Sequence, residues 1–310
     1  MNIAFNILPI FLVIGLGIGA KKVGFLPREF LVPGNRLAFY IAIPAMLFRA
    51  IALTPVRDTL NPVVAGICWA ALGLGWLATV LIAARLFPGP ADASRATWIQ
   101  GATHGNQGIL GLAVVVYGLG SAATGVAGLL TGLIIVGQNV VSVYTLNRWG
   151  SGHRQKGSLA KQTLGNPIIL STLAGLLFAL SPLTLPGFVD RTLQIVGGMG
   201  LPLALMMIGA TFADSRPGQI NWLEMGLLTI IKLVGLPTLG LGLLLMADIS
   251  GLPAVVTLVL LSSPSATLCV VMANEMGGDP RLASAAITMT HAFSALSYLL
   301  WLYLGSSWFY

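Results

Sequence analysis

Two short polar stretches decide how this chain folds: HGNQG at residues 104–108 and SSPS at residues 262–265. Each interrupts a long apolar run near its middle, and the two lie at corresponding places in the two halves of the chain. Inside a bilayer no water satisfies loose backbone groups, so an unwound helix is tolerated only beside protein or a wet cavity. A matched pair of interrupted apolar runs is the sequence signal of a transporter's binding site. The pattern therefore predicts a protein that moves a small solute across a membrane.

The composition around these stretches excludes an ordinary soluble protein. Of 310 residues, 56% are hydrophobic and 8% are charged, with a mean hydropathy of +0.90, whereas soluble domains carry roughly 25% charged residues. The net charge of +7 does not indicate nucleic-acid binding, because the basic residues are scattered through short loops rather than gathered on one face. Cys68 and Cys269 lie in apolar stretches of opposite halves, which favours buried packing over a disulfide or a metal site.

Several kinds of chemistry have no motif in this chain. The sequence has no Gly-rich phosphate loop with Lys-Ser/Thr, no Gly-x-Ser-x-Gly turn and no metal-spaced His/Cys cluster. We therefore expect a protein that is not an enzyme, that needs no cofactor or metal, and that does not bind nucleic acid.

The apolar runs predict an all-α integral membrane protein with ten transmembrane helices. The expected spans lie near residues 3–20, 35–53, 61–87, 95–117, 121–146, 164–181, 189–212, 221–247, 253–274 and 281–304, most of them close to the roughly 20 residues that a crossing needs. The first run has no basic stretch before it, so we expect a retained span rather than a cleaved signal peptide.

Lysines and arginines are concentrated in the loops that follow odd-numbered spans. Those loops hold Lys21, Lys22, Arg28, Arg36, Arg85, Arg95, Arg148, Arg154, Lys156, Lys161, Arg216 and Arg281, and the opposite side holds Arg49, Arg57 and Arg191. Cytoplasmic loops carry the excess of positive charge. The distribution predicts a multi-pass protein of the cell (inner) membrane with both termini outside the cytoplasm.

One hydrophilic stretch divides the chain into two sets of five spans. The predicted boundaries are 1–146 for the first five-helix repeat, 147–163 for a cytoplasmic linker and 164–310 for the second repeat. An odd number of spans in each half forces the halves into opposite orientations, which is an inverted repeat. Helices 4 and 9 are then the broken, crossing helices.

The two breaks together predict a binding site for a carboxylate or a similar anion. The half-helix that follows each break presents free N–H groups and the positive end of its dipole. Amides at the first break and hydroxyls at the second add polar contacts. The expected substrate-binding residues are Gly105, Asn106, Gln107, Gly108, Ser262, Ser263, Pro264, Ser265 and Lys232. A pair of kinked helices whose polar groups satisfy one another is the alternative.

Other polar residues within spans are candidates for coupling or for lining the cavity. Lys232 is an ionisable residue deep in a span and so a functional candidate, as a counter-charge to a carboxylate or as a proton-linked switch, unless its stem reaches the interface. His104 and His291 are candidates for proton coupling, with helix packing as the alternative. Gln138 and Asn139 lie on a polar stripe of the fifth span, which lines the cavity or forms interhelical hydrogen bonds.

Motifs along the whole chain resemble the auxin efflux carrier family, in its prokaryotic branch, within the bile/arsenite/riboflavin transporter superfamily. The motifs are LPIF at 8–11, NRLAFY at 35–40, PAMLF at 44–48, GNQGILGL at 105–112 with YG at 117–118, NP at 166–167, PLA at 202–204 and GA at 209–210. Plant members have proline at both crossings, whereas the fourth span here has glycines and no proline.

The resemblance implies a scaffold of helices 1, 2, 6 and 7 and a transport domain of helices 3–5 and 8–10. It implies elevator-type alternating access, with Asn106 and residues 262–265 as substrate contacts, and a substrate among organic anions such as auxin, malate or malonate. We therefore expect a secondary transporter of mono- or dicarboxylates. A sodium-coupled symporter of the bile-acid type and a receptor that binds without transport stay open. Gly15 and Gly19 make a homodimer one expectation.

Overall fold

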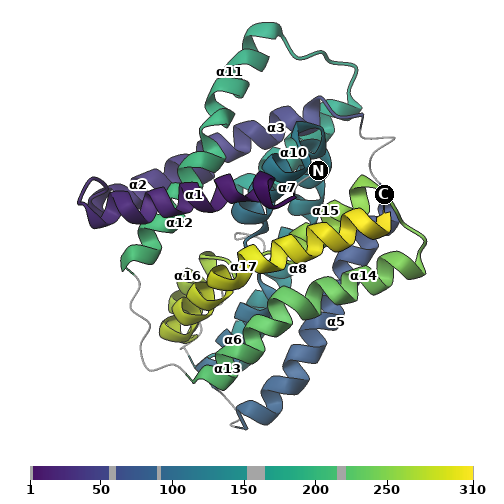
Figure 1. The fold of residues 1–310 in the computed structure, drawn as a ribbon. Helices are drawn as coiled ribbons and strands as arrows, with labels where there is room; N and C mark the ends of the chain where they lie inside the picture. The colour runs from purple at the N-terminus through teal and green to yellow at the C-terminus, as the bar shows by residue number, and fades with distance from the viewer. Residues whose placement is uncertain (1–2, 56–60, 89–91, 152–164, 215–220, 310) are drawn as a thin grey trace. The chain divides into compact units, whose positions relative to one another are not determined.

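The computed structural model describes residues 3–55, 61–88, 92–151, 165–214 and 221–309. Within these residues every regular element is a helix, and the β-type pairing is confined to one isolated bridge between Gly105 and Ser265. The predicted all-α class is confirmed (Figure 1). The α-helices are α1 (Ile3–Lys22), α2 (Arg28–Leu37), α3 (Ile43–Ala52), α5 (Pro62–Leu86), α6 (Ala93–Thr103), α7 (Leu112–Leu119), α8 (Thr124–Trp149), α10 (Pro167–Leu180), α11 (Gly187–Gly198), α12 (Gly200–Asp214), α13 (Trp222–Ile230), α14 (Leu236–Met246), α15 (Leu252–Leu261), α16 (Leu268–Met276) and α17 (Pro280–Phe309).

Four short segments of other helix types join some of these α-helices. Three are π-helices, which carry i→i+5 hydrogen bonds, and one is a 3₁₀ turn. They are η1 (Ala38–Ala42), η2 (Gln107–Gly111), η4 (Ile231–Gly235) and the 3₁₀ turn η3 (Ser121–Ala123). Helices such as α13, η4 and α14 therefore continue into one another without a loop.

Six helices in the described part of the chain are long and apolar enough to cross a membrane, which supports a multi-pass protein. They are Glu29–Ala52, Pro62–Leu86, Ser121–Trp149, Gly187–Ala213, Trp222–Met246 and Pro280–Phe309, and shorter apolar helices cover Gln107–Leu119, Pro167–Leu180 and Leu252–Leu261. The count of ten spans and the inverted repeat stay predictions. Most of the expected linker and five of the basic residues used for orientation, Arg57, Arg154, Lys156, Lys161 and Arg216, lie outside the described residues.

The helices pack into two compact units. One comprises Met1–Asn61, Gly108–Leu133 and Leu164–Ser215, and the other comprises Pro62–Gln107, Ile134–Thr163 and Arg216–Tyr310. We call them unit 1 and unit 2. The boundaries of the two repeats, at 146 and 164, and the division into scaffold and transport domains stay predictions.

Unit 1 is held together by close backbone contacts and by one ion pair. A Cβ atom on Gly17 of α1 would lie 2.9 Å from the backbone carbonyl carbon of Met206, so glycine is what lets α1 approach α12. Between α3 and α11, the Arg49 guanidinium donates two hydrogen bonds to the Asp190 carboxylate, at 2.6 and 3.1 Å. Such a two-point pairing fixes the relative orientation of its two helices.

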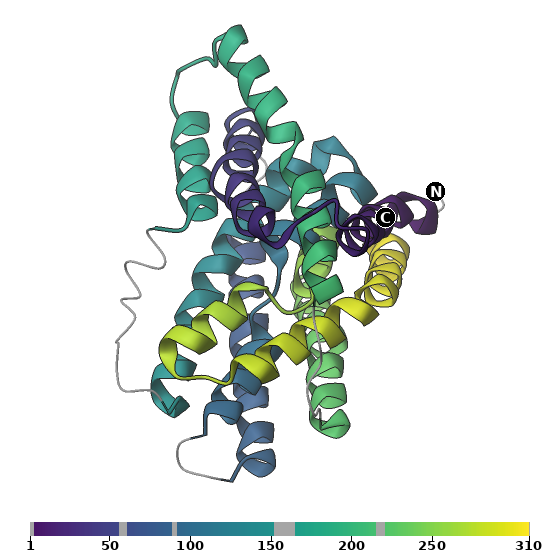
Figure 2. The same cartoon turned by 90° about the vertical axis from the view of Figure 1, so that its left-hand side faces the viewer.

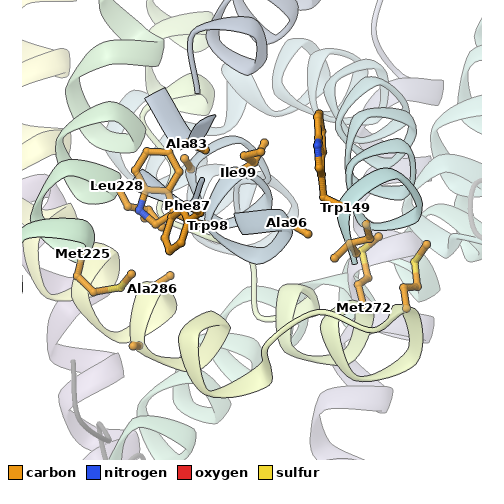
Figure 3. Close-up of a cluster of buried hydrophobic side chains, with 14 of the residues drawn as sticks. Ala83, Phe87, Ala96, Trp98, Ile99, Trp149, Met225, Leu228, Met272 and Ala286 are labelled. Carbon is orange, nitrogen blue, oxygen red and sulfur yellow. The ribbon is translucent and has the colours of Figure 1, made fainter. Parts of the chain in front are cut away.

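Unit 2 encloses the short helix α6 almost completely. Figure 3 shows Trp98 of α6 packed among apolar side chains that include Phe87, Leu228 and Ala286. The Trp98 indole N–H donates to the Glu224 backbone carbonyl at 2.8 Å. Because packed interiors have few voids, α6 is held firmly in place just before the first break. Figure 2 shows α17, drawn from yellow-green to yellow, as one long helix.

Candidate functional site

The first break separates α6 from η2 at residues 104–106. The helix ends with a hydrogen bond from the His104 N–H to the Gln100 carbonyl at 2.7 Å. The next residue, Gly105, is held by the Gln138 side chain of α8: its N–H donates to Oε1 at 3.0 Å and its carbonyl accepts from Nε2 at 3.2 Å. A single buried amide therefore satisfies both backbone groups that the missing helical turn leaves open.

The second break separates α15 from α16 at residues 262–267. Pro264, which lacks an N–H, lies inside it. The Ser265 N–H donates to the Thr290 hydroxyl of α17 at 3.0 Å. The Ser265 hydroxyl donates to the Gly101 carbonyl at 2.6 Å. That carbonyl belongs to the last turn of α6, where carbonyls have no N–H partner within the helix. The second break therefore caps the C-terminal end of α6.

The two breaks pair with each other through one isolated antiparallel bridge. The bridge joins Gly105 and Ser265, with one hydrogen bond from the Asn106 N–H to the Pro264 carbonyl at 2.7 Å and another from the Ala266 N–H to the His104 carbonyl at 2.9 Å. Both interruptions fall in the stretches that the sequence singled out. These backbone N–H and carbonyl groups form hydrogen bonds with one another, so any ligand must be bound by other groups.

Lys232 provides an unpaired charge beside the first break. Its side chain is 0% exposed, and Nζ has no hydrogen-bond partner among the described residues. A Cβ atom on Gly105 would lie 2.7 Å from Nζ, which places the ammonium directly against the break. The acidic side chains that the structure describes are all at least partly exposed. A buried charge is normally paired, and this ammonium has no hydrogen-bond partner among the described residues.

Gln107 adds an amide to the same place. A Cβ atom on Gly105 would lie 2.6 Å from Gln107 Nε2, so this amide and the Lys232 ammonium border the same backbone position. Gln107 Oε1 is buried, again with no partner within the described part of the chain. An ammonium and an amide N–H are the donors that a carboxylate accepts from.

A proline places Lys232 where it lies. Lys232 belongs to η4, and Pro237 follows the end of η4 by two residues. Proline has no N–H for the carbonyl four residues earlier, which is that of Leu233. This carbonyl accepts instead from the Ser297 hydroxyl at 2.9 Å and from the Trp301 indole N–H at 2.8 Å, both on α17. The π-helix is thereby anchored to α17, and Lys232 with it.

The two histidines take different roles in the site. His104 Nδ1 lies 2.8 Å from the Ser142 hydroxyl of α8. His291 Nδ1 lies 2.9 Å from the Ile287 carbonyl, which only accepts, so Nδ1 carries a hydrogen. Its Nε2 lies 3.4 Å from Asn106 Nδ2 and accepts from that amide when the ring is neutral. His291 therefore orients Asn106, and proton coupling by either histidine stays a prediction.

Some predicted residues are engaged elsewhere. The Ser262 and Ser263 hydroxyls both donate to the Val259 carbonyl of their own helix, at 2.9 and 3.4 Å. Asn139 is buried beside Gln138, with no hydrogen bond to the break among the contacts of the described residues. Gly108 continues the chain inside η2.

Two residues of the site were not predicted from the sequence. Thr290 precedes His291 in an apolar helix and bonds the second break, and Pro237 shapes the turn that carries Lys232. The sequence signal that could have identified Pro237 is its position five residues after the intramembrane Lys232. Within the described residues no group of three or more His, Cys, Asp or Glu is arranged to hold a metal ion.

Comparison with known proteins agrees with the predicted family. The sequence model of the family described as "Membrane transport protein" matches twice, at residues 3–151 and 152–302. A Rhizobium meliloti (strain 1021) protein named "Putative malonate transporter" is 29% identical over 307 residues, covering 96% of this chain and 94% of the relative. An uncharacterized transporter of Methanocaldococcus jannaschii is 26% identical over 306 residues, covering 95% and 96%. The resemblance to the auxin efflux carrier family is confirmed, and these names indicate a transporter rather than an enzyme.

Proposed function

This chain belongs to the membrane transport protein family, which contains the auxin efflux carriers, and we propose that it is a secondary transporter of small organic anions. The observation that carries the proposal is Lys232, whose fully buried amino group lies beside a broken helix without a hydrogen-bond partner among the described residues. An ionisable residue inside a membrane protein marks a substrate or ion pathway by default. A single positive charge calls for one carboxylate.

The neighbours of Lys232 support a carboxylate rather than a larger polar solute. Gln107 offers an amide, and Asn106 is held in place by His291. The relative named for malonate supports a mono- or dicarboxylate as the substrate.

The proposal includes the architecture that the family implies. Ten spans in two inverted five-helix repeats cross the cell membrane, with both termini outside the cytoplasm and the broken helices 4 and 9 crossing near its centre. Alternating access is of the elevator type, in which one domain carries the site past the other. The apolar helices that are long enough to span support this arrangement.

The proposal is tested by uptake of radiolabelled malonate, acetate and succinate into proteoliposomes that contain the purified protein. We expect saturable uptake of at least one carboxylate. Uptake at low substrate concentration should fall by about tenfold or more in Lys232→Met, because a charge-assisted contact contributes on the order of 1.5–3 kcal/mol, and Lys22→Met should leave it unchanged. Asn106→Ala should also reduce uptake.

The same vesicles separate the alternatives. Uptake that requires sodium would replace the proposal by a sodium-coupled symporter of the bile-acid type. Saturable binding without any flux would replace it by a receptor. Equal uptake by the wild type and by Lys232→Met would remove the site from the proposal.

A further inference from the structure

We propose that this transporter is an anion exchanger, because its site closes readily only when an anion neutralises Lys232. The inference rests on the proposed function and adds a mode of action to it: each passage in either direction carries a substrate. Net uptake into empty vesicles is then slow, and exchange of one carboxylate for another is fast.

The first step of the argument is that no group of the described chain neutralises Lys232. The neighbouring Cys269 thiol lies 3.9 Å from the His104 carbonyl and donates to it, so it is not an anion there. His104 itself is neutral or cationic, never negative. The acidic side chains whose burial the structure describes are all at least partly exposed, and Nζ has no hydrogen-bond acceptor among the described residues.

The second step is that the backbone that carries Lys232 is held inside the protein. The Leu233 carbonyl next to it is tied to two side chains of α17, Ser297 and Trp301. The ammonium lies against Gly105, whose backbone is fixed by Gln138. The charge therefore moves with the backbone that surrounds it, and it stays inside whenever the site is closed.

The third step concerns the closed state that every alternating-access cycle passes through. An uncompensated charge enclosed away from water is costly, and an ion pair with good geometry offsets most of that cost. With a carboxylate bound as a monoanion, malonate in its singly protonated form, closure encloses a pair of opposite charges. Without one, closure either encloses a lone ammonium or requires Lys232 to release its proton, and both cost free energy at neutral pH. The empty site should therefore pass through the closed state at least about tenfold more slowly than the occupied site.

The test compares two sets of proteoliposomes, one preloaded with unlabelled malonate and one with buffer alone. Initial uptake of labelled malonate is measured with equal potassium on both sides and valinomycin present, so that no membrane potential develops. We expect uptake to be about tenfold or more faster into the preloaded vesicles, both for the wild type and for Lys232→Arg. For Lys232→Met, measured at a higher malonate concentration, the ratio should be near one.

Melting of the ligand-free protein in detergent provides a second readout, which does not need transport by the variant. Lys232→Met should melt at or above the wild type, because it removes an unpaired buried charge and keeps a similar volume. A Lys232→Met protein that melts well below the ligand-free wild type would contradict an uncompensated ammonium.

The outcomes are distinguishable from those of the proposed function. Equal wild-type uptake into preloaded and empty vesicles would overturn exchange and leave anion transport standing. A Lys232→Met protein that keeps a tenfold ratio would overturn the role of Lys232. Absence of uptake and of binding for every carboxylate would instead overturn the proposed function.

Discussion

The two helix breaks solve the same backbone problem with different chemistry. At the first, a glycine is held at its N–H and its carbonyl by one amide, Gln138 of α8. At the second, a serine is held at its N–H by one hydroxyl, Thr290 of α17, and uses its own hydroxyl to complete α6. What the two breaks share is a helix that follows later in the chain and satisfies the open backbone groups. The residue types differ.

The breaks differ also in what they leave over for a ligand. Around the first, Lys232 Nζ is buried without a partner among the residues that the structure describes, and Gln107 Nε2 borders the same backbone position. At the second, the Ser262 and Ser263 hydroxyls return to their own helix, and Ser265 bonds Gly101. This comparison favours an asymmetric site, in which the first break and Lys232 recognise the anion and the second break gives support.

The largest loss of stability is expected for Gln138→Leu. The change removes both hydrogen bonds to Gly105 and leaves a buried N–H and a buried carbonyl unpaired, at about 1–3 kcal/mol each. The free energy of unfolding should fall by about 2–6 kcal/mol, measured by denaturation in detergent. Asn139→Leu, at the next position of α8, is the matched control and should change it by less than about 1 kcal/mol.

A smaller loss is expected for Thr290→Val, which keeps the side-chain shape and leaves only the Ser265 N–H unpaired, for about 1–3 kcal/mol. Its control is Thr288→Val, because the Thr288 hydroxyl bonds only to the Ser284 carbonyl of its own helix. Equal destabilisation by Thr290→Val and Gln138→Leu would contradict the expected difference between one side-chain hydrogen bond at the second break and two at the first.

The smallest effect on stability, with a large effect on transport, is expected for Gly105→Ala. The new Cβ atom would lie 2.7 Å from Lys232 Nζ and 2.6 Å from Gln107 Nε2. Both are ends of flexible side chains, and Gly105 does not have a positive φ, so the fold should lose only about 1 kcal/mol or less. Malonate uptake should drop by about tenfold, because both donors move.

Gly66→Ala is the control for the change at Gly105. Nothing lies within 4 Å of a Cβ atom built on Gly66 of α5, and alanine there should leave uptake unchanged. Wild-type uptake by Gly105→Ala would show that the anion is not recognised at the first break and would favour the second break as the binding site.

The sequence was sufficient for the helical class and for the position of both breaks. Glycines and polar residues at 104–108, and a proline among serines at 262–265, interrupt apolar runs in a way that local propensity detects. The partners of the breaks were harder to predict. Gln138 and Thr290 lie on other helices, and a polar residue on a helix does not reveal which neighbour it will face. The packed protein brings Gln138 of α8 to the first break and Thr290 of α17 to the second.

The surroundings of Lys232 show where sequence reasoning stopped. Its depth in an apolar run marked it as a candidate, but its lack of a partner is a property of the packed protein. The π-helix that carries it was missed, since such segments differ from an α-helix by one hydrogen-bond step and have weak sequence preferences. Pro237 was a local hint, and the same offset recurs between η1 and Pro44.

A π-helical segment of this kind is, in effect, an α-helix with one surplus residue. Deleting a single residue of η4, such as Val234, would return the rod to regular winding and turn everything ahead of the deletion by about 100° around the axis. The ammonium would then point at a different neighbour, although every polar group of the site remained in the chain. The number of residues in η4 thus sets the direction of the Lys232 side chain, which can be changed without substituting any residue.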